Sequence, residues 1–162
     1  MKRPSQICSD VTEQPNWQKF HQTYNPTTMS KKNATQLFEE AKEDLKRAMQ
    51  ELYRPSQDVV SFSACTFSRR SLYKYLHGLA QLYAEEKNIM LEPNLTIDQL
   101  ITFCSQYNKK LKQVDFSNLY CKCNEVLKDP DEEIVHCTSV DMVTYCADLA
   151  EKVRDIATEK TG

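Results

Sequence analysis

The chain has 162 residues, about the size of one domain, and its 40% hydrophobic and 27% charged residues with a net charge of −2 argue against a disordered chain. Average usage would give about 11 glycines in this length, but there are two, Gly78 and Gly162. Phosphate-binding loops, dinucleotide-binding turns, nucleophile elbows and tight β-hairpins all depend on glycine, so the composition predicts an all-α fold without them.

The predicted architecture is a single bundle of about five helices, residues 33–162, preceded by a polar tail, residues 1–32. The tail holds three of the six prolines and few apolar residues. Within it, "PNWQKFHQTYNP" places Trp17, Phe20 and Tyr24 at i, i+3 and i+7, on one face of a short helix. This face either docks onto the chain's own bundle or anchors in a groove of a partner protein.

Apolar periodicity predicts the first two helices of the bundle. The first begins at Asn33 as its N-cap, and the second runs from about Ser68 to Asn88 with apolar residues around half of its circumference, as expected for a central helix. Residues 58–67 between them are either a short extended piece or a further helical turn. Gly78 costs about 1 kcal/mol within a helix relative to alanine, so we expect another backbone, preferably of the same bundle, close against it.

Capping signals mark the later helices. Thr96 and Gln99 form a predicted capping box at the start of the third helix, and a shorter fourth helix covers about residues 117–128. The fifth is predicted to begin at Thr138, with Asp141 in the capping-box position.

Three cations of the second helix are candidate docking residues: Arg69, Arg70 and Lys74. Arginine in a first helical turn is disfavoured by the helix dipole, which indicates a compensating acidic group. That group belongs either to an acidic partner or, as we prefer, to the chain's own acidic C-terminal region. Together with the three aromatic residues of the tail, these cations are the predicted partner-binding residues.

Four residues resemble a ligand set for zinc in composition: Cys121, Cys123, His136 and Cys137. A structural zinc site usually has two residues between its first pair of ligands, whereas a single lysine separates this pair, and on a helix the two thiols would point to opposite sides. Position on the apolar face makes Cys123 a core residue, and Cys104 and Cys146 also fall on inner faces. We therefore expect no metal and no cofactor, and keep a zinc-supported module as the alternative.

No residues form a convincing catalytic set, so we predict that the protein is not an enzyme. His136 and Cys137 are adjacent in sequence, which seldom lets two side chains face each other, and no glycine turn accompanies them to bind an oxyanion. No pair of carboxylates can be assigned as acid and base.

Nucleic-acid binding is the second alternative. The strings "SRRSLYKY" and "YNKKLK" combine cations with tyrosines that could neutralise phosphate and stack on bases. Few cations on separate helices in a chain with a pI near 5.9 make a weak electrostatic footprint, so other proteins are the expected partners.

The chain also has four Ser/Thr-Gln pairs, the acceptor motif of glutamine-directed kinases. Two belong to a repeated "RPSQ" string, which makes Ser5 and Ser56 the candidate phosphorylation sites, although chance explains the count more simply.

The predicted function is therefore a non-enzymatic interaction module, or a subunit of a larger complex, in the cytoplasm or nucleus. Seven cysteines, an odd number, suit a reducing compartment. The chain has neither an apolar run long enough to cross a membrane nor an apolar segment near its N-terminus, so we expect no membrane association. The sequence does not indicate an oligomeric state.

Overall fold

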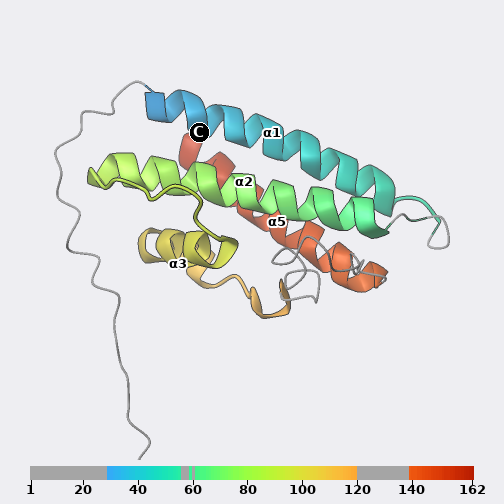
Figure 1. Cartoon of the computed structure of the whole chain (residues 1–162). Coiled ribbons are helices and arrows are strands. Elements are labelled where there is room, and N and C mark those ends of the chain that lie inside the picture. Colours follow the sequence, from blue (N-terminus) through green and yellow to red (C-terminus); the bar gives the residue numbers. More distant parts are fainter. Residues whose placement is uncertain (1–28, 56–58, 60, 120–138) are drawn as a thin grey trace, which may run out of the picture.

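The computed structural model describes residues 29–55, 59, 61–119 and 139–162, and these form a helical bundle (Figure 1). No strand occurs among them, so the predicted all-α fold is confirmed. In chain order the elements are α1 (Met29–Leu52), α2 (Ser61–Lys87), α3 (Ile97–Tyr107), α4 (Lys109–Lys112), the 3-10 turn η2 (Ser117–Leu119) and α5 (Val140–Thr161).

The first two helices begin earlier than the periodicity indicated. α1 starts at Met29, so Asn33 lies inside the helix and is not its N-cap. α2 starts at Ser61, which settles most of the ambiguous stretch 58–67 as helix and moves Arg69 and Arg70 out of the first turn. Contrary to the prediction, the helix dipole does not disfavour these two arginines, because the field of a helix terminus falls off within one turn.

Capping chemistry fixes the start of α3 as predicted. The Thr96 hydroxyl accepts a hydrogen bond from the Gln99 backbone N–H at 3.3 Å, and the Gln99 side chain accepts one from the Thr96 N–H at 2.8 Å. Asn108 then ends α3 and caps the single turn of α4 by accepting hydrogen bonds from two backbone N–H groups. Together these caps satisfy backbone donors that the helices leave unpaired.

The structure describes only parts of the last two predicted helices. Residues 117–119 form a 3-10 turn, and the rest of the predicted fourth helix lies outside the described residues. The N-cap of α5 is Ser139, whose hydroxyl accepts from the Met142 N–H at 3.4 Å. Thr138 was therefore one residue early as the predicted cap, and Asp141 does not occupy the capping-box position.

α2 is the central helix, as its apolar circumference predicted, and it packs against α1, α3 and α5. α1 runs antiparallel to α2, since the Ser71 hydroxyl donates to the Ala41 carbonyl at 2.8 Å near the middle of both helices and Gly78 faces Phe38. α5 runs parallel to α2: Val143 packs near the start of α2, and Lys160 pairs with Glu86 near its end.

The core is built mainly from leucine and alanine. Leu72, Leu76 and Leu79 of α2 have no exposed surface, and each such burial contributes about 1.5–3 kcal/mol. Cys104 and Cys146 are buried on the inner faces of α3 and α5, as predicted. None of the helices in the described part of the chain has the length and apolar character needed to cross a membrane.

Candidate functional site

A buried ion-pair network joins α1 to α2. The Asp44 carboxylate of α1 is 3% exposed, and the Lys74 ammonium group of α2 lies 2.9 Å from its Oδ2. Lys74 also lies 3.1 Å from Glu40, and the Arg70 Nε lies 3.5 Å from Asp44 Oδ2. The hydrogen bond from Lys74 lowers the pKa of the Glu40 carboxyl below its ordinary value. The network fixes the register of the two helices, because an unpaired carboxylate at this depth would be costly.

This network changes the interpretation of the predicted docking cations. Arg70 pairs with an acid of its own chain, but the acid is Asp44 of α1 and not one of the C-terminal region, so that part of the prediction was wrong. Lys74 is 16% exposed and engaged with two acids. Arg69 is half-buried. The Arg70 side chain, by contrast, is 52% exposed.

Arg70 also takes part in an aromatic stack on the α1–α2 hairpin. Two guanidinium groups contact the Phe67 ring, with the Cζ of Arg47 at 5.6 Å and that of Arg70 at 6.0 Å from the ring centroid. Contacts of this geometry contribute about 0.5–1 kcal/mol each at exposed sites. The stack therefore holds two cations in fixed positions while leaving part of Arg70 in solvent.

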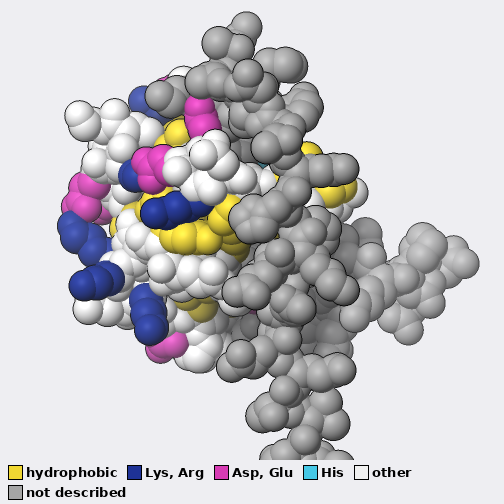
Figure 2. All heavy atoms as spheres, turned by 90° about the vertical axis from the view of Figure 1, so that its left-hand side faces the viewer, with side chains coloured by type: hydrophobic (Ala, Val, Ile, Leu, Met, Phe, Trp, Pro, Cys, Tyr) yellow, Lys and Arg dark blue, Asp and Glu magenta, His cyan; other side chains and the backbone are white. Residues whose placement is uncertain are grey.

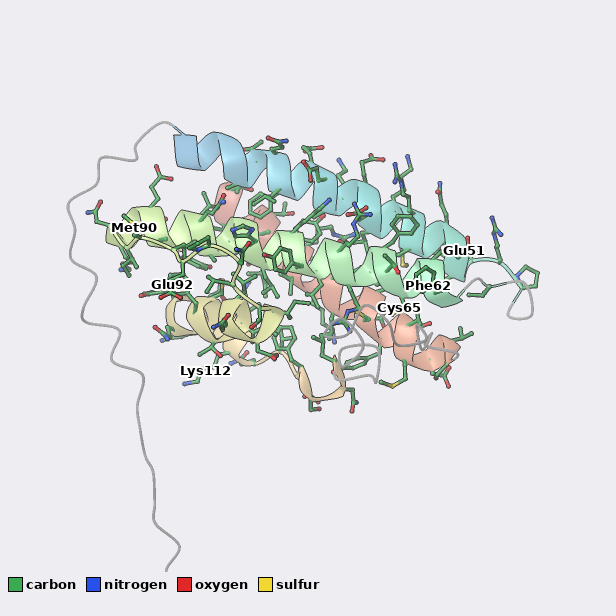
Figure 3. The ribbon with its side chains drawn as sticks, in the orientation of Figure 1. Glu51, Phe62, Cys65, Met90, Glu92 and Lys112 are labelled. Carbon is green, nitrogen blue, oxygen red and sulfur yellow. The ribbon has the colours of Figure 1, made fainter. Side chains whose placement is uncertain are left out.

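Two large hydrophobic side chains are exposed at the same end of the hairpin. Tyr53 follows α1 and is 82% exposed, and Phe62 lies in the first turn of α2 and is 45% exposed. Figure 3 shows Phe62 at this end of the bundle, with Glu51 and Cys65 nearby, and Met90 at the opposite end. We call Tyr53, Phe62 and the Arg47–Phe67–Arg70 stack the hairpin-end surface. The sequence did not reveal it, because Tyr53 and Phe62 border a segment whose helical start was not recognised.

A groove lies on a different part of the molecule, along the seam between α1 and α5. Two adjoining hollows of about 460 Å³ and 290 Å³ share Thr35, Phe38 and Thr161 as lining residues. Its lining is mixed, with the apolar Leu82 and Ala157 beside charged side chains such as Lys42 and Arg154. At one end an oxygen of Glu85, Oε2, is buried without a hydrogen-bond partner. We call this feature the α1–α5 groove. Figure 2, which faces the end where α1 begins, shows hydrophobic side chains at the surface among cations and acids.

Phe38 separates the α1–α5 groove from Gly78. A Cβ atom at Gly78 would lie 2.4 Å from the Phe38 ring, which also stacks on Tyr75 with 6.0 Å between centroids. The prediction that Gly78 permits a close approach within the bundle holds, but the approaching group is an aromatic ring and not a backbone. Glycine leaves room for this ring, which a larger residue would push outward.

The nucleophilic and titratable groups of the described residues do not converge on a reaction centre. Cys104 is fully buried, and burial raises the pKa of its thiol to about 12, so the thiol keeps its proton. Burial also lowers the pKa of His77, whose ring packs 5.7 Å from that of Tyr73. Among the described residues no group of three or more His, Cys, Asp or Glu side chains is placed to hold a metal ion.

The cations considered for nucleic-acid binding are dispersed. Lys110 pairs with Glu159 of α5, and the Lys87 ammonium lies 5.9 Å from the Tyr107 ring centroid. The basic string 107–112 thus lies at the α3–α4 end, apart from the network around Lys74.

Several predicted site residues lie outside the described residues. They are the tail aromatics Trp17, Phe20 and Tyr24, the zinc alternative Cys121, Cys123, His136 and Cys137, and the candidate phosphorylation sites Ser5 and Ser56.

Comparison with known proteins does not add to these observations. The sequence matches no protein-family model, and neither curated proteins nor solved structures gave a significant match.

Proposed function

We propose that this chain is a non-enzymatic helical module for protein–protein interaction, a subunit of a larger intracellular assembly. The observation that carries the proposal is the exposure of Tyr53 and Phe62 at the hairpin end, in the same helical hairpin as a phenylalanine that contacts two arginines. Aromatic residues and arginine supply most of the binding free energy in protein interfaces.

The chemistry of the hairpin-end surface indicates what kind of partner it would bind. Two exposed aromatic rings fit an apolar pocket, and the guanidinium groups of Arg47 and Arg70 favour carboxylates around that pocket. Because the Phe67 stack already orders both arginines, less side-chain freedom is lost when they bind. The expected partner therefore presents an apolar hollow with an acidic rim.

Other features support an interaction role. Burial raises the pKa of the Cys104 thiol, so this thiol keeps its proton near pH 7 and is not prepared for nucleophilic catalysis. Cys104 is a free thiol, which suits a reducing compartment.

Phosphorylation at Ser5 and Ser56 stays part of the proposal. In sequence, Ser56 lies between Tyr53 and Phe62, so a phosphate there would add negative charge to the segment that joins the two halves of the hairpin-end surface. We expect such a charge to weaken binding to a partner with an acidic rim.

The test compares proteins that co-purify with the full chain and with two variants. The double variant Tyr53→Ser with Phe62→Ser should lower the recovery of specific partners at least tenfold, as measured by quantitative mass spectrometry. Met90→Ser is the matched control, since Met90 is 54% exposed at the other end of the bundle. Circular dichroism checks that all chains keep their helical content.

Equal recovery of every co-purifying protein with the double variant would refute the hairpin-end surface. Equal loss with the Met90 control would show that the binding was nonspecific and would refute it as well.

A further inference from the structure

The α1–α5 groove results from the way three helices meet. α1 packs chiefly on α2, and α5 packs on another side of α2, so α1 and α5 touch each other much less. The seam is left open along the first half of α1, with Phe38 and Tyr75 among its lining residues. A seam of this kind, between two helices with a third beneath, has the shape that accepts one more amphipathic helix.

We propose that residues 15–26 of the same chain dock as a short helix in the α1–α5 groove, with Trp17, Phe20 and Tyr24 as its anchors. Their spacing of i, i+3 and i+7 is the pattern by which a helix fills an apolar groove. Pro15 and Pro26 border the segment and limit the helix to the region between them.

The length of the connection brings these anchors to the groove. Residues 25–28 separate the segment from α1, and helix–helix connections in bundles usually have 2–8 residues. In an antiparallel helical hairpin, residues equally far from the middle of the connection lie level with each other. Phe20 is then level with Asn33, and Trp17 with Gln36.

This register coincides with the open part of the seam. The α1 residues that line the groove run from Ala34 to Lys42. The lining therefore begins one residue beyond the level of Phe20 and extends beyond the level of Trp17. Side chains on a helix point toward its N-terminus, which directs the anchors further along the groove in an antiparallel hairpin. Trp17 therefore reaches the hollow beside Phe38.

Polar chemistry at the end of the groove also fits the segment. The Glu85 Oε2 atom is buried without a hydrogen-bond partner, and a buried acceptor of this kind is costly. The Tyr24 hydroxyl is a donor on the anchoring face, and Glu85 lies near the start of α1 because α2 runs antiparallel to it. Docking would thus satisfy an acceptor as well as cover the apolar lining.

Trp17 is the only tryptophan, so its fluorescence reports on the segment in the full chain. We expect the folded chain to emit at shorter wavelength than the urea-unfolded chain. Thr158→Arg, in the groove wall on α5, should shift this emission to longer wavelength and raise its quenching by acrylamide. Thr144→Arg is the matched control: both threonines are exposed on α5 and donate to the carbonyl four residues earlier at 2.9 Å.

Thr161→Arg repeats the test if Thr158→Arg lowers the helical content seen by circular dichroism. Emission at the unfolded wavelength in the native chain would overturn the proposal. A short-wavelength emission that both groove variants leave unchanged would also overturn it, because Trp17 would then be buried elsewhere. Emission that moves to longer wavelength on dilution would assign the groove to the segment of a second copy and overturn docking within one chain.

Discussion

Replacing Lys74 by methionine tests the most consequential contact in the bundle. Methionine keeps most of the aliphatic packing but removes the ammonium group 2.9 Å from the buried Asp44 carboxylate. Breaking a buried ion pair costs about 3–5 kcal/mol. The cost should be lower here, about 2–3 kcal/mol, because Arg70 remains 3.5 Å from the same oxygen and Lys74 is 16% exposed.

For a chain of this size, a loss of 1 kcal/mol lowers Tm by about 2–4 °C, so we expect Tm to fall by about 4–12 °C. Urea unfolding followed by circular dichroism measures the corresponding free energy. Lys46→Met, at an exposed position of α1, is the control and should change stability by less than about 0.5 kcal/mol.

A double variant separates the charge from the packing. Asp44→Leu combined with Lys74→Met removes both members of the pair, and an apolar replacement of a buried pair is often neutral or stabilising. We therefore expect the double variant to be more stable than Lys74→Met alone. If the double variant is less stable than Lys74→Met, or if Lys74→Met behaves like the Lys46 control, the buried Asp44 side chain does not depend on Lys74.

Three further predictions follow from the core and the cysteines. Gly78→Ala should destabilise the chain by about 1 kcal/mol, since overpacking against Phe38 costs about 1–3 kcal/mol and the gain in helix propensity offsets about 1. In a Phe38→Leu background the same change should be stabilising; a stabilising Gly78→Ala in the unmodified chain would contradict the ring contact. Burial raises the pKa of Cys104 from 9.0 to about 12, so the folded state holds a proton that the unfolded state loses, and the urea midpoint should fall as pH rises from 9 toward 12. The fall should be smaller in Cys104→Ala, and an identical slope would exclude this thiol as a cause. Adding a zinc chelator should leave Tm unchanged, whereas a drop would support the zinc alternative, because a structural ion contributes folding free energy directly.

Local signals predicted the parts of the fold that depend on neighbouring residues. The Thr96–Gln99 capping box and the inward position of Cys104 follow from spacing within a few residues, and both are present. Asn33 carried an equally plausible capping pattern, yet α1 continues through it to Met29. An N-cap signal shows that a helix can begin at a residue, and the residues before it decide whether the helix does begin there.

The candidate surfaces depend on tertiary contacts that periodicity does not specify. Gly78 indicated a close approach, but only packing shows that Phe38 from α1 supplies it. Arg70 indicated an acidic neighbour, and the register of α1 on α2 selected Asp44. Likewise, the α1–α5 groove is lined by residues from three helices, so no single stretch of sequence could reveal it.

The central position of α2 has a consequence for how the chain assembles. The ion pair between Lys74 of α2 and Asp44 of α1 spans 30 residues, whereas Lys160 of α5 meets Glu86 of α2 across 74. Short-range contacts close faster than long-range ones, so the α1–α2 hairpin should form while the side of α2 that faces α5 is still uncovered. During synthesis that side of α2 would stay uncovered until α5 emerges, which makes this interval the period of greatest exposure to aggregation and to chaperones.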